Sequence, residues 1–315
     1  MNAEHKVQAW SILILLSLIW GSSFLLIKLG LEHFSASEVG SMRIAIAFLF
    51  LLPIALLRLR ELRRADIPWL AFSGIVGNLT PSLLFAYAEL VISSSVAGVL
   101  NSLTPIFTAI VAASLFGSRF SRANITGILI GLVGAVGLVM ATNNNQFDVH
   151  TGYALLVVLA TICYAFNGNI IKNKLSHLRP VTIAAFGFLM AGPVAIIHLG
   201  AFTQLSQSLM APGAMEGLLY VAILAIAGSA IALMIFNRLL QMTNVVFSAS
   251  VTYLIPVVAI LVGVAAGEEF RASYLFWFAC IVAGVFLVNN VPGKRKKQYK
   301  LILKKQKPLP LQETE

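Results

Sequence analysis

Ten apolar runs, each about the length of a bilayer crossing, follow one another along the chain with only short linkers between them. A membrane-spanning helix needs about 20 mostly apolar residues, because inside hydrocarbon the backbone must satisfy its own hydrogen bonds. The expected spans are 10–29, 39–57, 68–90, 94–116, 123–141, 151–171, 181–199, 215–237, 245–266 and 273–290. No room remains for a folded soluble domain. We therefore predict an all-α integral membrane protein with ten transmembrane helices.

The composition agrees with this prediction. Of the 315 residues, 59% are hydrophobic and 11% are charged, whereas a soluble domain carries about 25% charged residues. The two cysteines, Cys163 and Cys280, both fall inside apolar runs and give no zinc-binding or disulfide spacing. No signal-peptidase site follows the first run, so we interpret that run as a span and not as a signal peptide.

The distribution of Lys and Arg predicts how the spans are oriented, because these residues concentrate on the cytoplasmic side of a membrane. With the N-terminus inside, 19 of the 22 Lys and Arg residues fall in inner segments. Arg271 alone lies in an outer loop, while Lys28 and Arg43 lie within spans near their outer ends. Both termini are therefore expected in the cytoplasm. The basic tail, 291–315, is expected to be disordered and to attract anionic lipid.

Two of the runs are interrupted by proline. The fourth contains Asn101-Ser102-Leu103-Thr104-Pro105, and the ninth contains Thr252-Tyr253-Leu254-Ile255-Pro256. Proline has no N–H, so the carbonyl four residues earlier loses its helical partner. The two prolines are 151 residues apart, and each follows a polar residue by four positions. We interpret Pro105 and Pro256 as matched helix breaks that serve gating, with ordinary membrane-helix kinks as the alternative.

Further residues repeat at the same spacing. Gly77-Asn78 in the third run matches Gly228-Ser229 in the eighth, again 151 residues later. An ordered series of such matches indicates an internal repeat. The predicted units are residues 10–141 and 151–290, each with five spans. Because five is odd, the second unit enters the membrane from the opposite side, and the resulting inverted repeat suits alternating access.

These features resemble the drug/metabolite transporter superfamily, and specifically its EamA-type exporters, over roughly residues 10–290. The resemblance is carried by Trp20-Gly21-Ser22-Ser23-Phe24, by Arg43, by Pro105 with Phe116-Gly117, and by Pro256 with Gly267-Glu268. It implies a secondary transporter of the inner (plasma) membrane that exports metabolites such as amino acids. The first half departs from the family pattern, since Gly117-Ser118 stands where Gly-Glu is favoured. We interpret the glutamate of the family's Gly-Glu pair as a structural residue.

Polar and aromatic residues inside the spans are the candidates for substrate binding, because polar groups are costly within a bilayer. Those near the helix irregularities are expected to line a central cavity for a small polar solute. The candidates are Trp20, Asn78, Asn101, Thr104, Tyr164, Asn167, Ser229, Thr252 and Tyr253. Asn167 is preferred over Asn169, since residues two apart on a helix face different directions. Helix–helix hydrogen bonding and aromatic packing are the alternatives.

Glu89 is the one carboxylate clearly inside a run. It lies near the outer end of its span, as Arg43 does, so the two side chains are candidates for a charge pair. The alternative is that Glu89 carries a coupling proton, since intramembrane carboxylates often serve proton relays. Lys28 and Lys172, near opposite faces of the membrane, either snorkel to the interface or take part in gating.

The favoured function is a secondary transporter that exports a small polar metabolite, with amino acids as the preferred substrates and protons as the candidate coupling ion. An uncoupled facilitator or channel for a nucleoside or sugar is the alternative. An intramembrane enzyme is disfavoured, because the sequence lacks a catalytic set such as His-Glu-x-x-His. No cofactor, metal ion or nucleic acid is expected. The glycine-rich face of the fifth span, 127–137, is expected to pack within the chain among membrane lipids, which favours a monomer.

Overall fold

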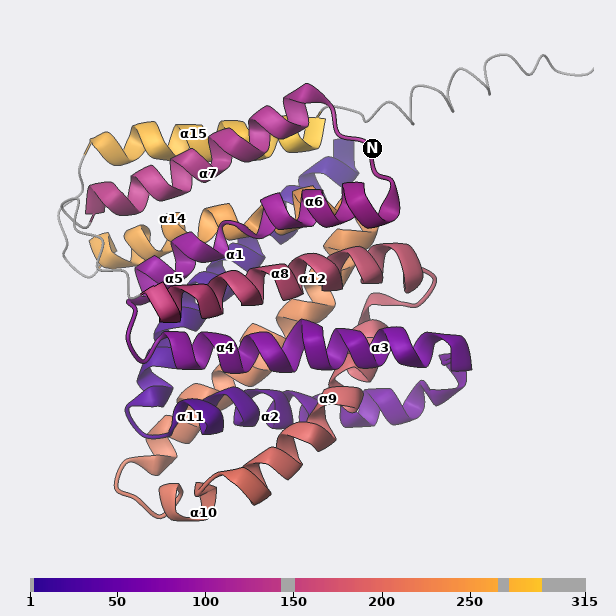
Figure 1. Cartoon of the computed structure of the whole chain (residues 1–315), viewed down its shortest axis with the longest axis vertical. Coiled ribbons are helices and arrows are strands. Elements are labelled where there is room, and N and C mark those ends of the chain that lie inside the picture. Colours follow the sequence, from indigo (N-terminus) through magenta and orange to yellow (C-terminus); the bar gives the residue numbers. More distant parts are fainter. Residues whose placement is uncertain (1–2, 143–150, 266–271, 291–315) are drawn as a thin grey trace, which may run out of the picture.

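The computed structural model describes residues 3–142, 151–265 and 272–290. The Gly267-Glu268 pair, Arg271 and the tail 291–315, all subjects of the expectations above, lie outside the described residues. Nearly all of the described chain is helical, and its helices pack side by side into one bundle (Figure 1). α7 and α15 lie together at one end of this bundle, and α2, α9 and α11 lie toward the other.

The first half of the chain forms helices where the apolar runs predict them. They are α1 (Ala3–Leu31), α2 (Ala36–Leu57), α3 (Ile67–Gly74), η3 (Ile75–Leu79), α4 (Thr80–Ala88), α5 (Ser94–Asn101), α6 (Thr104–Phe116) and α7 (Arg122–Thr142). The short 3-10 turns η1 (Leu59–Glu61) and η2 (Arg64–Asp66) connect α2 to α3. α3, η3 and α4 continue one another as a single span.

The second half repeats this order. Its helices are α8 (Thr151–Lys174), α9 (Pro180–Phe202), the short α10 (Leu205–Ser208), α11 (Ala214–Ala225), η4 (Ile226–Ile231), α12 (Ala232–Met242), α13 (Val245–Ala249), α14 (Val251–Ala265) and α15 (Ser273–Asn290). α11, η4 and α12 form one continuous span, as α3, η3 and α4 do.

Seven stretches of the described chain are helical, long and apolar enough to cross a membrane. They are Glu4–Leu31, Ala36–Leu57, Arg64–Ala88, Val96–Phe116, Gly152–Lys174, Pro180–Phe202 and Ala214–Met242. The remaining three expected spans coincide with shorter apolar helices, at Arg122–Gly137, Val245–Val258 and Ser273–Val288. The chain is therefore an all-α, multi-pass membrane protein, while ten crossings remain a prediction.

The two halves contact each other reciprocally. α2 packs against α9, and α7 packs against α15. α1 packs against α14 in the way that α8 packs against α6, and α1 meets α11 and α12 as α8 meets α3 and α4. Several contacts of the first half thus have a counterpart in the second. A two-fold relation between two units requires this reciprocity.

The expected irregularities at Gly77-Asn78 and Gly228-Ser229 are both π-helical. Gly77-Asn78 lies in η3, and Gly228-Ser229 lies in η4. A π-helical turn takes one more residue than an α-helical turn and frequently marks a functional site. A Cβ at Gly77 would lie 2.2 Å from the side chain of Asn167 on α8, so a larger residue there would force this side chain to shift. The irregular turn therefore brings two spans into close contact.

The two helix breaks differ in their details. In the fourth span the chain turns at Ser102-Leu103, and Pro105 lies in the first turn of α6, where its missing N–H is not needed. In the ninth span the turn is at Ser250, and Pro256 lies inside α14. The expectation of a break at Pro256 itself is corrected: the helix continues through this proline, and the chain turns six residues earlier.

Glycines on α7 let it pack closely against α15. A Cβ on Gly284 of α15 would lie 2.5 Å from the backbone nitrogen of Gly131 and 2.7 Å from the carbonyl oxygen of Gly127. The small-residue face of the fifth span is thus covered within the chain. Oligomeric state remains a prediction.

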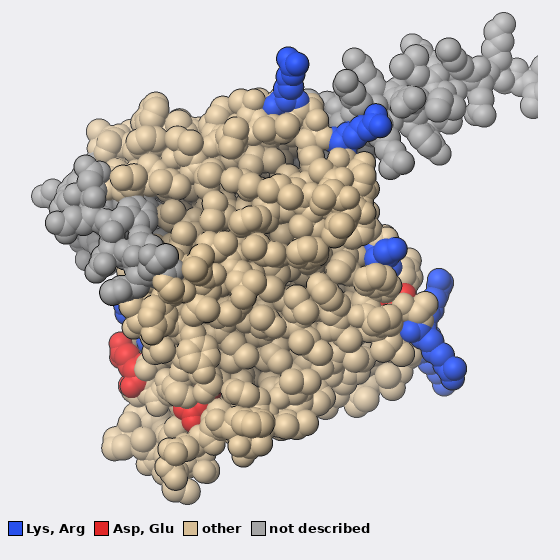
Figure 2. Space-filling view, in the orientation of Figure 1, with Lys and Arg blue, Asp and Glu red and all other residues tan. Residues whose placement is uncertain are grey.

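The charged side chains are unevenly placed along the helix axes. Figure 2 shows most of the visible Lys and Arg residues at one end of the helices, the end where the N-terminus of α1 and the connection from α2 to α3 lie. Most of the visible acidic side chains lie at the other end. This pattern supports the prediction that the basic end is cytoplasmic.

Candidate substrate-binding cavity

A cavity of about 130 Å³ lies between the two halves of the chain. The spans that line it are α1, α2, η3–α4 and α5–α6 from the first half, and α8, α9, η4–α12 and α13–α14 from the second. One water takes up about 30 Å³ of liquid, so the space holds a small solute and not merely a single water. Its position makes the cavity the candidate functional site.

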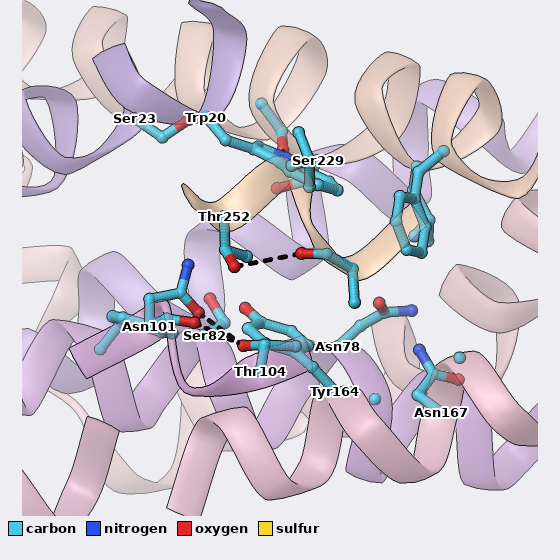
Figure 3. Close-up of a pocket in the computed structure, with 18 of the residues that line it drawn as sticks. Trp20, Ser23, Asn78, Ser82, Asn101, Thr104, Tyr164, Asn167, Ser229 and Thr252 are labelled. Carbon is cyan, nitrogen blue, oxygen red and sulfur yellow. Dashed lines mark hydrogen bonds between the residues drawn. The ribbon is translucent and has the colours of Figure 1, made fainter. Parts of the chain in front are cut away.

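Eight of the nine candidate residues line this cavity: Trp20, Asn78, Asn101, Thr104, Tyr164, Asn167, Ser229 and Thr252. Figure 3 shows Trp20 and Ser229 on one side of the space, with Tyr164, Asn78 and Asn167 on the other. Residues from both repeats therefore face a common interior. Substrate binding by these residues remains a proposal.

The ninth candidate, Tyr253, lies elsewhere. It is fully buried, and its hydroxyl donates a hydrogen bond to the carbonyl oxygen of Ile128 on α7 at 2.9 Å. The reason is geometric, because successive residues of a helix point about 100° apart. Since Thr252 faces the cavity, Tyr253 is directed toward α7, where its ring fills the space above Gly131.

Trp20 joins the first repeat to the second. Its indole Nε1 donates a hydrogen bond to the carbonyl oxygen of Gly228, within the π-helical segment η4, at 2.9 Å. Its ring lies 5.3 Å from the ring of Phe236, measured between centroids. On the opposite side, Tyr164 stacks on Phe85 with centroids 6.1 Å apart. The cavity thus has aromatic walls contributed by both halves.

Both carbonyls that the prolines leave without a helical partner accept a hydrogen bond from a hydroxyl group. Thr104 Oγ1 donates to the carbonyl of Asn101 at 2.7 Å. Ser102 Oγ donates to the carbonyl of Thr252, in the other repeat, at 3.1 Å. The sequence analysis named Ser102 only as part of the motif. The signal that could have identified Ser102 as a donor was its hydroxyl, which lies in one proline motif and can reach a carbonyl that the other proline leaves without a helical partner.

Two asparagines at the cavity keep polar atoms that have no partner among the described residues. These atoms are Nδ2 of Asn78 and Oδ1 of Asn167, and both are buried. Asn169 is turned away from the cavity, and its Nδ2 donates to the carbonyl of Thr108 at 3.1 Å. A buried polar group without a partner costs about 1–3 kcal/mol. The unpaired atoms of Asn78 and Asn167 are therefore candidates for contacts that form in another conformation or with a solute.

Arg43 and Glu89 form no ion pair with each other, in contrast to the expectation of a charge pair. The guanidinium of Arg43 reaches across to the second repeat, where its Nε donates to Ser229 Oγ at 2.6 Å. Glu89 caps the end of α4 and accepts a hydrogen bond at Oε2 from Ser94 Oγ at 3.1 Å. Its Oε1 is buried without a partner among the described residues. Arg43 also lines the cavity, which the sequence analysis did not expect.

Lys172 contacts the end of a helix in the second repeat. Its Nζ donates hydrogen bonds to the carbonyls of Leu240 at 2.6 Å, Gln241 at 3.2 Å and Thr243 at 2.7 Å. These carbonyls lie at the C-terminal end of α12, where a positive charge is favourable. Lys28, its counterpart in the first repeat, is exposed.

Comparisons with known proteins identify the family of the chain. The model of the EamA-like transporter family matches residues 8–140 and again residues 151–290. The chain is 29% identical to the uncharacterized inner membrane transporter YedA of Escherichia coli K12, over 92% of this chain and 93% of that protein. A solved structure titled only as the crystal structure of a protein matches 94% of this chain and 100% of its own length, with a TM-score of 0.70 and 18% identity. That likeness concerns the fold.

Two further relatives have more specific names. One, 25% identical, is a probable terminal-alkyne amino-acid exporter of Streptantibioticus cattleyicolor, matched over 90% of this chain and 94% of the relative. The other, also 25% identical, is a probable amino-acid metabolite efflux pump of Salmonella typhimurium, with the same two coverages.

Proposed function

Because the chain belongs to the EamA-like transporter family, we propose that it is a secondary transporter that exports small polar metabolites, amino acids among them, across the inner (plasma) membrane. The observation that supports this most directly is the cavity between the two halves, lined by polar and aromatic residues from both. Transporters built from inverted repeats bind substrate at the repeat interface. The names of two relatives support amino acids as substrates.

Alternating access is the proposed mechanism. Among the described residues, four hydrogen bonds that involve a cavity-lining residue join one half to the other: Trp20 to Gly228, Arg43 to Ser229, Ser102 to Thr252, and Asn169 to Thr108. Each must persist, break or be exchanged when the halves move relative to each other. The π-helical segments and the turns at Ser102-Leu103 and Ser250 are the points where the spans can bend. The protein is proposed to work as a monomer among membrane lipids.

Glu89 is the proposed carrier of a coupling proton. Its side chain is 2% exposed, has no ion-pair partner among the described residues, and leaves Oε1 unpaired. A buried carboxylate without a paired charge is costly in its ionised form. The basic side chains that act on it electrostatically are Lys28 on α1 and Arg43 on α2, and Ser94 donates its one hydrogen bond. Protonation can therefore respond to movement of α1 or α2.

A transport screen tests the proposal. The purified full-length protein would be reconstituted into liposomes and loaded with amino acids, nucleosides or sugars, with and without an imposed proton gradient. We expect efflux of at least one amino acid above the rate of protein-free liposomes, accelerated by the gradient. Efflux of a nucleoside or sugar alone, unaffected by the gradient, would favour the facilitator alternative. No efflux of any solute in the screen would contradict the proposal.

A further inference from the structure

Arg43 is the single charged residue among the described residues that line the cavity. Its guanidinium forms no ion pair with any described residue. One hydrogen bond is recorded for it in the described part of the chain, from Nε to Ser229 Oγ. A guanidinium carries five N–H donors. Four of them therefore remain for a group inside the cavity.

Ser229 holds this guanidinium in place. Its hydroxyl oxygen accepts from Arg43 Nε at 2.6 Å and its hydroxyl proton is directed to the carbonyl of Leu224 at 3.3 Å. That carbonyl lies five residues earlier, which is the spacing of the π-helical segment η4. With Nε occupied, the terminal amino groups of Arg43 are left to bind a ligand. Ser229 is thus a positioning residue for Arg43.

A positive charge in a largely apolar cavity requires a negative partner. Burying an unpaired charge is costly, and pairing it inside the protein or with a ligand removes much of that cost. The planar fork of a guanidinium matches a carboxylate, which it binds with two parallel hydrogen bonds. A single carboxylate neutralises the guanidinium, and the ammonium group of a zwitterionic amino acid can donate to a polar lining atom such as the unpaired Oδ1 of Asn167. A phosphate monoester would add a second negative charge that no described lining residue balances.

We propose that Arg43 anchors the carboxylate of the transported solute, so that the substrates are small molecules with one carboxylate, such as amino acids, and not nucleosides, sugars or phosphate esters. This inference rests on the proposed function, because it assigns a substrate class to the same cavity. It also changes the expected role of Arg43 from a partner of Glu89 to a direct contact of the solute.

A binding experiment on the full-length protein in detergent tests this assignment. The probes are alanine, leucine and phenylalanine, their carboxamides, uridine, glucose and glycerol 3-phosphate, each titrated while thermal unfolding is followed. We expect at least one amino acid to raise the melting temperature, with its carboxamide binding at least about tenfold more weakly. Arg43→Gln should weaken binding of that amino acid by about 10- to 100-fold, and it should not weaken binding of the carboxamide, which lacks the carboxylate.

Two further variants keep the test decisive if Arg43→Gln fails to fold. Arg43→Lys retains the charge without the fork and should bind the amino acid about tenfold more weakly. Ser229→Ala retains the guanidinium and removes the hydroxyl that holds it, so a loss of a few-fold is expected. Arg58→Gln, at the C-terminal end of the same helix and outside the cavity, is the matched control and should bind as the unmodified protein does.

The inference is overturned if no amino acid of the panel binds, if a carboxamide binds as tightly as its acid, or if glycerol 3-phosphate, uridine or glucose is the preferred ligand. If any of these results is obtained and the liposome screen still shows efflux of a neutral solute, the proposed transporter function is retained and only the role of Arg43 is rejected. Absence of all efflux in that screen is the separate result that would contradict the function itself.

Discussion

Ser102 Oγ lies 3.1 Å from the carbonyl oxygen of Thr252, across the interface between the two repeats, and 3.1 Å from that of Gly98 in its own helix, and its hydroxyl donates to these two acceptors. The carbonyl of Thr252 is the one that Pro256, four residues later, cannot satisfy. Ser102 itself lies at the turn that interrupts the matched span of the first half. One helix break thus supplies the hydrogen-bond donor that the other needs.

Replacing Ser102 with alanine should leave the Thr252 carbonyl unsatisfied in a fully buried position. We expect the free energy of unfolding to fall by about 1–3 kcal/mol, measured by thermal unfolding in detergent. The matched control is Ser114→Ala in the same span, where the hydroxyl is exposed and bonds only within its own helix. An equal effect of the two substitutions would show that the contact between the repeats contributes nothing.

Replacing Pro256 with alanine should slow transport more than it lowers the amount of folded protein. Alanine restores an N–H that bonds the Thr252 carbonyl within α14 and competes with Ser102 for it. A gained hydrogen bond of about 0.5–1.5 kcal/mol shifts the ratio of two transporter states by about two- to tenfold. Transport rate per folded molecule is the measurement.

The matched substitution Pro105→Ala should have a smaller effect. Pro105 lies in the first turn of α6, where a backbone N–H is not required, and the carbonyl of Asn101 already accepts a hydrogen bond from Thr104. Normal transport by both variants would indicate that neither proline contributes to conformational exchange.

Replacing Glu89 with glutamine should remove the response of transport to a proton gradient, because glutamine keeps the shape of the side chain but cannot bind or release a proton. We expect efflux driven by an imposed gradient to fall to the rate measured without one. Glu32→Gln, at the exposed end of α1, is the control and should keep the response. A Glu89→Gln protein that still responds fully would place the coupling elsewhere.

Replacing Gly284 with alanine should separate α15 from α7, since the added Cβ meets the backbone of Gly131 and Gly127 and not a movable side chain. We expect a loss of about 1–3 kcal/mol of stability. Gly200→Ala in α9 is the control, because a Cβ there has no neighbour within 4 Å, and it should be neutral or stabilising by up to about 1 kcal/mol. Similar melting temperatures would show that α7 and α15 can move apart at little cost.

Single cysteines test the orientation of the chain. In a background carrying Cys163→Ala and Cys280→Ala, Gln207→Cys should react with an impermeant thiol reagent added to intact cells. Arg60→Cys should react only after lysis. Both positions are exposed and lie in opposite connections, one after α9 and one after α2. The reverse labelling pattern would invert the predicted topology.

The sequence predicts the helices well because their lengths follow from bilayer thickness and composition, which need no knowledge of packing. The irregular turns at Gly77-Asn78 and Gly228-Ser229 were also foreseeable, since the same polar and glycine pair recurs at a constant spacing. These predictions rest on local chemistry.

The direction of individual side chains is harder to predict. Tyr253 faces α7 because its neighbour Thr252 faces the cavity, and successive residues of a helix point about 100° apart. Arg43 looked like a partner for Glu89 because both lie near the outer ends of their spans. Its long side chain instead reaches Ser229, in a part of the sequence 186 residues away. Pairings of this kind depend on helix rotation and side-chain reach, which a hydropathy pattern does not contain.

The two π-helical segments begin at Ile75 and Ile226, 151 residues apart, the same distance that separates the two prolines. Acquiring an additional residue at one equivalent place in two separate helices would require two coincident insertions. A single acquisition in a five-helix unit, followed by duplication and fusion of that unit, would account for both turns with one event. The two turns now carry different residues, Asn78 in one and Ser229 in the other.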